Sequence, residues 1–290
     1  MKQTTFLIAG GDLRFICLAE YLAARGGEVY LVGFDKAPSV PDTVKQCRAP
    51  RPADYIILPL PVSNDGATVN TPCSDSTLLI ADVISAAKSK VVFGGRFPCD
   101  TLELLSQKGI QAIDYSAREE FAVLNAAATA EGAIQAIMEE TARTILGQKI
   151  LIVGMGRIAK ALMRALSGFG ADITAAARKC SDRAWAEIFG CKNIKISDLH
   201  YYTKDFDIII NTVPALIFDR SLLSELKKDC LVIDLASKPG GVDFEAAAQH
   251  GIRALWLLSI PGKVAPLSAG ETIGRTIINI LDERGELDGT

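Results

Sequence analysis

The chain has 290 residues, of which 49% are hydrophobic and 22% charged, and its net charge is -3. At about 100–200 residues per domain, this length predicts two globular domains and excludes a disordered chain. The small negative charge excludes the basic surface that a nucleic acid needs, so nucleic acid is not an expected partner. The seven cysteines are scattered and never form C-x-x-C, which indicates free thiols and no metal site.

The N-terminal stretch contains one short apolar run, residues 6–9, which is too short for a signal peptide. We expect no segment elsewhere to be long and apolar enough to span a membrane. The sequence therefore predicts a cytoplasmic protein with no membrane partner.

Short apolar runs alternate with amphipathic stretches along the chain, which is typical of parallel strands joined by crossover helices. In the first half, such runs predict strands at residues 4–9, 28–34, 55–60, 90–95 and 111–115. The first of them leads into a glycine turn, GGDLR. We expect an open, doubly wound, Rossmann-like sheet.

A helical connector follows, because residues 117–147 are rich in Ala and Glu and carry apolar side chains at helical spacing. Thr129 is suited to cap the start of a helix, and Gly147 stands where a helix would end. We assign the connector itself to residues 126–147.

The second half predicts strands at residues 149–154, 172–178, 207–212, 230–236 and 253–258. The expected fold class is thus α/β, with two doubly wound Rossmann-like domains. Residues 1–125 form the first, which we expect to hold the substrate and the catalytic groups, and residues 148–268 form the second, which we expect to bind the cofactor. Residues 269–290 predict a C-terminal helix that crosses back to the first domain.

The second domain opens with GMGRIA, a G-x-G-x-x-A turn between a buried strand and an amphipathic helix. Gly154 permits the tight turn, Gly156 lets the backbone approach a pyrophosphate, and Ala159 keeps helix and strand close. The phosphates are expected to meet free N–H groups at the start of the helix, at Arg157 and Ile158. The helix is expected to bury one face, which consists of Ile158, Leu162, Leu166 and Phe169.

The second strand of this domain ends in AARK, without the Asp or Glu that usually bonds the adenosine ribose. A carboxylate would repel a 2′-phosphate, whereas the Arg178 guanidinium can bind one bidentately, with Lys179 beside it. NADP is therefore the expected cofactor. Later strand ends supply residues for its nicotinamide end, namely Thr212, Pro214, Ala236, Ser237 and Pro239.

The first glycine turn has Phe15 where a dinucleotide turn needs a third small residue, so a second dinucleotide is not expected. The carboxyl ends of strands in an open α/β sheet still form a crevice. The residues expected to converge there are Gly11, Asp12, Arg14, Pro61 and Arg96. The cations available for a carboxylate-bearing substrate are Arg14, Arg96, Arg118 and Lys263.

The two histidines, His200 and His250, lie in outer segments away from both glycine turns. A histidine acid or base, such as hydroxyacid dehydrogenases use, is therefore not expected.

Distinctive segments run in order from end to end of the chain: AGGDLR, VYLVGFD, YIILPLPVSNDG, REEFAVLNAAATAEGAI, VGMGRIAKAL, DIIINTVPAL, VIDLASKPGGVDFE and PGKVAPLSAG. LASKPGG followed by PGKVAP is the most specific pair. In these segments the chain resembles the family of dipicolinate synthase A subunits, which occurs in endospore-forming bacteria.

The resemblance implies synthesis of dipicolinate, pyridine-2,6-dicarboxylate, from the cyclic imine dicarboxylate made by dihydrodipicolinate synthase. That substrate must lose water and one hydride equivalent to become aromatic. The resemblance also implies a flavoprotein-like partner, the dipicolinate synthase B subunit. It further implies that this protein is located in the mother-cell cytoplasm of a sporulating bacterium. Whether the protein also forms a homo-oligomer is left open by the sequence.

Aromatisation drives this reaction, so the protein's main task is to orient the substrate and fix its two carboxylates. For the base, the implied candidates are Lys238, Asp12 and Glu119, in that order, with Arg14 as a catalytic cation. Further substrate contacts are expected from the connector and beyond, at Asn125, Thr129, Glu131 and Lys263.

Two other interpretations stay open. One is another NADP-linked dehydrogenase of the same build, acting on a shikimate-like or 2-hydroxy acid substrate, since NTVP resembles a stretch in shikimate dehydrogenases. The other is a noncatalytic NADP(H)-binding protein whose partner performs the redox step.

Overall fold

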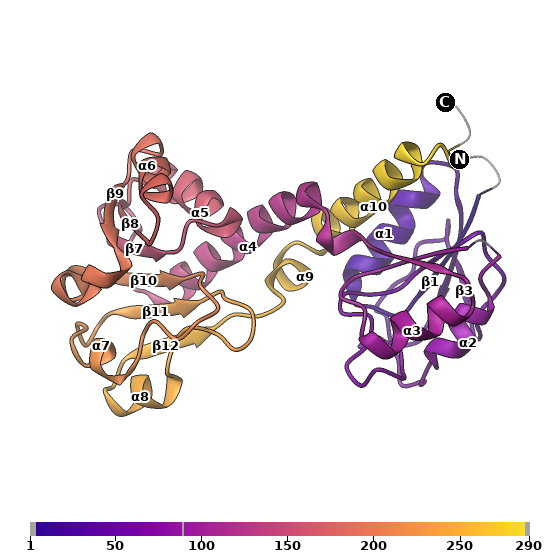
Figure 1. Ribbon diagram of the computed structural model, residues 1–290, viewed down its shortest axis with the longest axis horizontal. Coiled ribbons are helices and arrows are strands. Elements are labelled where there is room, and N and C mark those ends of the chain that lie inside the picture. The colour runs from indigo at the N-terminus through magenta and orange to yellow at the C-terminus, as the bar shows by residue number, and fades with distance from the viewer. Residues whose placement is uncertain (1–3, 89, 288–290) are drawn as a thin grey trace. The chain divides into compact units, whose positions relative to one another are not determined.

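The computed structural model describes residues 4–88 and 90–287 (Figure 1). The chain divides into two compact units: unit 1 comprises Met1–Asn125 and Ala265–Thr290, and unit 2 comprises Ala126–Val264. Each unit is built on a six-stranded parallel sheet with helices on both faces. The expected α/β class with two Rossmann-like sheets is therefore confirmed.

The sheet of unit 1 has the strand order β3-β2-β1-β4-β5-β6. Its strands are β1 (Thr5–Ala9), β2 (Glu28–Val32), β3 (Lys45–Cys47), β4 (Tyr55–Ile57), β5 (Val91–Gly94) and β6 (Gln111–Asp114). Its helices are α1 (Leu13–Ala23), α2 (Ile80–Ser85), α3 (Cys99–Gln107), the 3-10 turn η1 (Tyr115–Ala117) and α10 (Pro266–Glu283). The strand order reverses between β1 and β4, and ligands of such folds bind at the carboxyl ends beside that reversal.

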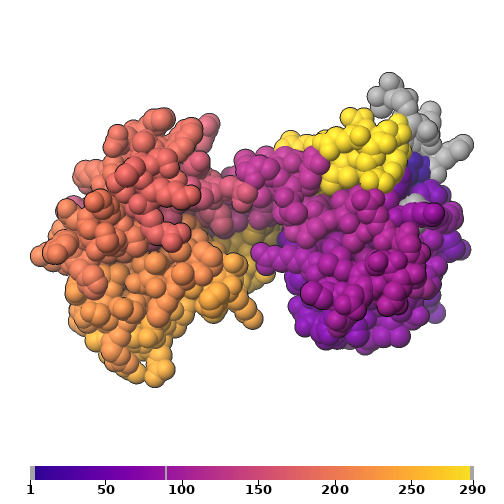
Figure 2. Space-filling view, viewed as in Figure 1, coloured from indigo at the N-terminus to yellow at the C-terminus, as the bar shows by residue number. Residues whose placement is uncertain are grey.

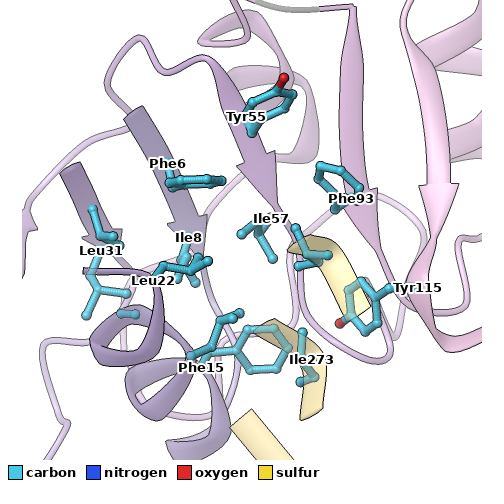
Figure 3. Close-up of a cluster of buried hydrophobic side chains, with 14 of the residues drawn as sticks. Phe6, Ile8, Phe15, Leu22, Leu31, Tyr55, Ile57, Phe93, Tyr115 and Ile273 are labelled. Carbon is cyan, nitrogen blue, oxygen red and sulfur yellow. The ribbon is translucent and has the colours of Figure 1, made fainter. Parts of the chain in front are cut away.

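Both faces of this sheet are buried. Phe6 and Ile8 of β1 pack against α1 and α10, whereas Leu7 and Ala9 pack on the opposite face with α2 and α3. Figure 3 shows the first cluster, in which Ile273 of α10 joins the strand side chains. Burial on both faces explains why the central strands are continuous apolar runs.

Helix α10 lies along α1 within unit 1 (Figure 1), and in Figure 2 the yellow C-terminal residues pack against the indigo to purple residues of the same unit. Two glycines let the helices approach closely. A Cβ at Gly270 would lie 2.4 Å from the carbonyl oxygen of Arg14, and one at Gly274 would lie 2.4 Å from the Tyr21 ring. Ile273 and Ile277, between and after these glycines, are fully enclosed.

The sheet of unit 2 has the order β12-β11-β10-β7-β8-β9, with its reversal between β7 and β10. Its strands are β7 (Lys149–Val153), β8 (Asp172–Ala177), β9 (Lys192–Lys195), β10 (Ile208–Asn211), β11 (Leu231–Asp234) and β12 (Arg253–Trp256). Its helices are α5 (Arg157–Gly168), α6 (Cys180–Ile188), η2 (Ile196–Tyr201), η3 (Thr203–Asp205), α7 (Arg220–Ser224), α8 (Phe244–Gln249) and α9 (Ile260–Val264). The central strands β7 and β10 again carry apolar side chains on both faces of the sheet.

Helix α4 (Glu119–Glu140) corrects two expectations about the connector. The helix ends at Glu140, seven residues before Gly147. Directly after this end, Thr141 donates both its N–H and its hydroxyl to the Ile137 carbonyl. Thr129 lies buried in the middle of the helix and does not cap its start. The boundary between the two units falls within α4.

Helix α4 also corrects the expectation that no segment could span a membrane. By length and composition it is the one helix in the described part of the chain that could do so. Half of that apolar stretch is buried against other parts of the protein, as in the core helix of a folded domain.

Candidate functional site

The glycine turn of unit 2 leaves open space at one glycine and none at the other. Gly154 has φ +108°, and a Cβ there would lie 2.2 Å from the Thr212 hydroxyl, which donates to the Val153 carbonyl. Gly156 begins α5 with no side-chain cap, and a Cβ added to it would meet no atom within 4 Å. The N–H groups at the start of α5 can therefore be reached by an anion, and the turn fits a pyrophosphate.

The first turn of α5 carries the other predicted phosphate contacts. Arg157 is exposed and Ile158 half-buried, and both follow Gly156 directly. Ala159 is fully buried, as the close approach of helix and strand requires. Phe169 departs from the predicted buried face, because it caps the end of α5 and is 44% exposed.

Two cations follow β8, at the edge where the adenosine end of a dinucleotide lies in such folds. Arg178 and Lys179 are both exposed, and Lys179 is the N-cap of α6. Among the described residues, neither side chain has a hydrogen bond or an ion pair. Both are therefore free to bind a phosphate.

A buried carboxylate organises the carboxyl ends of β10 and β11. Asp234 is fully enclosed and accepts hydrogen bonds from the Asn211 amide (2.8 Å), the Ala236 N–H (3.0 Å) and the Gly241 N–H (2.7 Å). Trp256 adds a bond from its indole N–H to the Ala236 carbonyl (2.9 Å). The loop after β11 is thus held at both ends.

That loop presents three exposed residues at its tip: Ser237, Lys238 and Pro239, with a cis bond before Pro239. The Lys238 side chain has no hydrogen bond or ion pair within the described ranges. Thr212 and Pro214, after β10, are half-buried and exposed. These residues were predicted from the sequence, whereas Asp234 was missed, although an acid at the end of a buried strand is a readable signal.

The glycine turn of unit 1 is filled by the chain itself. The Gly11 N–H donates to the Asn70 carbonyl (2.9 Å), and a Cβ at Gly10 would lie 2.7 Å from Val69. The loop 62–79 thus covers the place that a pyrophosphate would take. Asp12 caps α1 with a carboxylate, which would repel a phosphate there.

Asp12 and Arg14 bind each other. The guanidinium is buried, with its Nε 2.8 Å from Oδ1 and its Nη2 2.9 Å from Oδ2, and Nη2 also donates to the Leu60 carbonyl (3.3 Å). Oδ1 accepts the Arg14 N–H as well (3.1 Å). This geometry gives both side chains a structural part in the turn and argues against Asp12 as a base and Arg14 as a substrate cation.

Arg96 lies in the left-handed region, with φ +56°, at the carboxyl end of β5. Its N–H donates to Asp114 (3.0 Å), which also accepts from the Ser116 N–H and hydroxyl. Its guanidinium is exposed and has no ion pair among the described residues. A non-glycine residue held in this conformation is a common feature of functional sites.

Hydrogen bonds join the loops around Arg96. The Gly95 N–H donates to the Pro59 carbonyl (3.1 Å), and the Val62 N–H donates to the Gly95 carbonyl (3.0 Å), on either side of Pro61. With the bond from Gly11 to the loop 62–79, the segments of Gly11, Pro61 and Arg96 lie together.

The other predicted residues lie elsewhere. The Arg118 guanidinium is 2.6 Å from Glu283 and 2.8 Å from Glu120, and these carboxylates raise its pKa, so it ties α10 to α4 and is not free for a substrate. Lys263 is exposed on α9. Four more residues lie on α4: Glu119, Asn125, Thr129 and Glu131. The boundary between the units separates the first two of these from the last two.

The histidines take no part in these strand ends. His200 lies on η2, with its Nδ1 3.0 Å from Glu225, and His250 caps the end of α8.

A surface pocket of about 540 Å³ lies at the carboxyl ends of β2 and β3 in unit 1. Its polar lining includes Asp35, Gln46, Arg48 and Ser76. The Asp35 carboxylate already accepts the Ser74 hydroxyl. The pocket contains none of the predicted site residues, and no sequence pattern pointed to it.

Comparison with known proteins gives two family matches. Residues 5–116 match the N-terminal domain of the dipicolinate synthase A subunit, whereas residues 120–246 match the NAD binding domain of D-isomer specific 2-hydroxyacid dehydrogenases. Fold, glycine turn and domain match together define an oxidoreductase of the dehydrogenase type with a nicotinamide dinucleotide cofactor.

Similarity to individual proteins covers nearly the whole chain. The dipicolinate synthase A subunit of Bacillus subtilis (strain 168) is 29% identical over 282 residues, 95% of each chain. The crystal structure of its counterpart from Bacillus halodurans is 30% identical, covers 97% of this chain and 98% of its own, and has a TM-score of 0.82. The Bacillus subtilis crystal structure is 28% identical over 99% of each chain, with a TM-score of 0.88. The chain belongs to the family of dipicolinate synthase A subunits.

Proposed function

We propose that this protein forms dipicolinate, for endospore formation, by NADP-dependent oxidation of a cyclic imine dicarboxylate after loss of water. The observation that carries the proposal is the open turn at Gly156, which is followed at the end of the next strand by Arg178 and Lys179 in place of a carboxylate. A free pair of cations at this edge favours the phosphorylated cofactor.

The cofactor contacts follow from unit 2. The turn Gly154–Ile158 holds the pyrophosphate, and Arg178 and Lys179 hold the 2′-phosphate. Thr212, Pro214, Ala236, Ser237 and Pro239 line the nicotinamide end, on loops that Asp234 fixes. When bound, the nicotinamide accepts the hydride that leaves the ring.

The reaction needs a base and anchors for two carboxylates. A base removes a proton from the carbon beside the imine, and the neighbouring hydroxyl leaves as water with a proton. The dihydro ring then gives up one hydride and one proton to become the pyridine ring. We assign the base to Lys238, because its side chain is exposed on a fixed loop whereas Asp12 is bound to Arg14. Glu119 stays the alternative.

Arg96 is the proposed anchor for one substrate carboxylate, because it is exposed, unpaired among the described residues and fixed in its backbone by Asp114. Gly11 and Pro61 lie in the same set of loops. Lys263, Asn125, Thr129 and Glu131 remain proposed substrate contacts. The relatives are named as A subunits of a synthase, so a B subunit partner and the mother-cell cytoplasm belong to the same proposal.

The direct test is to incubate the protein with the cyclic imine and NADP+, with and without the partner protein, and to record the ultraviolet absorption of dipicolinate. We expect product to form with NADP+. Absence of product under both conditions would contradict the proposal.

The match of residues 120–246 to 2-hydroxyacid dehydrogenases favours a second candidate, an NADP-linked dehydrogenase of a hydroxy acid. His200 lies on η2 and His250 at the end of α8, so neither lies directly after β7, β10 or β11, which argues against a histidine acid or base for that reaction. Reduction of NADP+ by a 2-hydroxy acid or by shikimate, without any dipicolinate from the imine, would favour it.

A noncatalytic role is tested with two variants. If chemistry occurs on this chain, Lys238→Ala abolishes turnover, Arg96→Ala raises the KM for the substrate, and both variants leave NADPH binding intact. Turnover at the wild-type rate in both variants would favour a protein that only binds the cofactor.

A further inference from the structure

Arg183 lies on the first turn of α6, five residues after Arg178. Its Nη1 donates to the Arg178 carbonyl (3.3 Å), and its Nη2 lies 3.4 Å from the Cys180 sulfur. Its backbone N–H donates to the Lys179 carbonyl (3.2 Å). The guanidinium is thus folded back over residues 178–180, and the turn itself holds it in place.

No carboxylate neutralises this guanidinium among the described residues. Residues 178–183 carry three positive charges, at Arg178, Lys179 and Arg183, against the single carboxylate of Asp182. Like charges held together repel one another. A guanidinium has five N–H donors, and the two bonds to the turn leave others to bind oxygen. Binding of a multiply charged anion would relieve this repulsion between the three side chains.

We propose that Arg183 is a further specificity-determining residue, which binds the 2′-phosphate of NADP(H) together with Arg178 and Lys179. This inference rests on the proposed function for its cofactor, and it extends the site to a residue that the strand-end pattern does not reveal. Because the turn already orients the guanidinium, little side-chain entropy is lost when the phosphate binds.

The test is a fluorescence titration of the full-length protein with NADPH and with NADH. Arg183→Ala is expected to weaken NADPH binding about tenfold, which corresponds to one charge-assisted hydrogen bond, and to leave NADH binding unchanged. Arg183→Lys keeps the charge without the planar fork and should recover part of the loss. The matched control is Arg220→Ala, which removes an exposed arginine from the start of α7 and should change neither affinity.

Two results would overturn the inference and leave the cofactor choice standing. One is an equal loss of NADPH and NADH affinity in Arg183→Ala, which would mean that Arg183 only supports the turn. The other is unchanged NADPH affinity in that variant while Arg178→Ala loses the preference for NADPH.

A third result would remove the proposed cofactor as well. This result is that the wild-type protein binds NADH at least as tightly as NADPH.

The double variant Arg178→Ala/Arg183→Ala gives a supporting result. A loss of NADPH binding free energy smaller than the sum of the two single losses supports the inference, because it shows that Arg178 and Arg183 act on the same phosphate.

Discussion

Gly154 and Gly156 stand two positions apart in the same turn and depend on glycine for different reasons. At Gly154 the backbone is left-handed and the Thr212 hydroxyl takes the room of a side chain. At Gly156 φ is -76°, which any residue adopts, and no protein atom is near. Nothing in the fold of unit 2 therefore requires glycine at position 156, whereas a bound pyrophosphate does.

The first prediction uses this difference. Gly156→Val is expected to abolish NADPH binding, because its side chain enters the space of the phosphates, and to lower the melting temperature only slightly, because valine is a poorer N-cap than glycine. Gly154→Val is expected to lower the free energy of unfolding by about 2 kcal/mol or more, through the clash and the left-handed backbone. Thermal unfolding and NADPH titration of both variants check this. Normal NADPH affinity in Gly156→Val would contradict the assigned turn.

The second prediction separates two arginines of unit 1. Arg96→Ala is expected to raise the KM for the dicarboxylate with little change in stability, because the guanidinium is exposed and unpaired within the described ranges. Arg14→Ala is expected to lower the free energy of unfolding by about 1–3 kcal/mol, because it leaves the Asp12 carboxylate without its partner. Urea unfolding with steady-state kinetics distinguishes the two effects. A large stability loss in Arg96→Ala would argue against its role as a substrate anchor.

At the scale of elements, the sequence pattern predicted the central strands and two of the four edge strands, β6 and β12, and missed the other two. β1 and β7 are continuous apolar runs because both their faces are covered. β3 (KQC) and β9 (KNIK), at the other two edges, contain no fully buried residue and carry no apolar run, so they were not predicted. The end of α4 was missed because the apolar spacing continues beyond Glu140.

The candidate site divides in a similar way. The turn 154–159 and Arg178 are local features, so spacing alone revealed them. The bond from Arg14 to the Leu60 carbonyl joins residues 46 positions apart, and the Asn211–Asp234 bond joins residues 23 apart. Such partners depend on how the strands pair, which a single sequence does not display.

The third prediction concerns an ion pair in unit 2 between Asp207, directly before β10, and Lys227, in the loop between α7 and β11. Burial alone would raise the pKa of Asp207, but bonds from Lys227 (2.8 Å) and the Lys149 N–H (2.9 Å) outweigh it and lower that pKa below 3.8. Because the folded pKa is depressed, this stabilisation is present above the unfolded pKa and is lost as the pH falls through the folded value.

Asp207→Asn should therefore lower the free energy of unfolding at neutral pH by about 1 kcal/mol and weaken its dependence on pH below about 4. Urea unfolding at a series of pH values provides the measurement. An unchanged acid limb in the variant would show that Asp207 does not contribute to acid sensitivity.

At the scale of the whole molecule, the two units have the same sheet topology and differ in what lies at the carboxyl ends of their strands, where ligands of such folds bind. The strand orders are equivalent, and the same bond recurs after the first strand of each sheet: Gly10 N–H to Val32 and Gly154 N–H to Ala176, both 2.9 Å. In unit 1 the loop 62–79 covers the glycine turn. In unit 2 the turn is open at Gly156. One scaffold thus supports a dinucleotide site in unit 2 and leaves the polar loops of unit 1 for the proposed substrate.

The most direct test of this account is a crystal structure of the protein with NADP+ and dipicolinate bound. We predict the pyrophosphate at the Gly156 N–H and the 2′-phosphate within hydrogen-bond distance of Arg178. A dinucleotide bound against residues 10–14, or an Arg178 guanidinium far from the adenosine end, would contradict it.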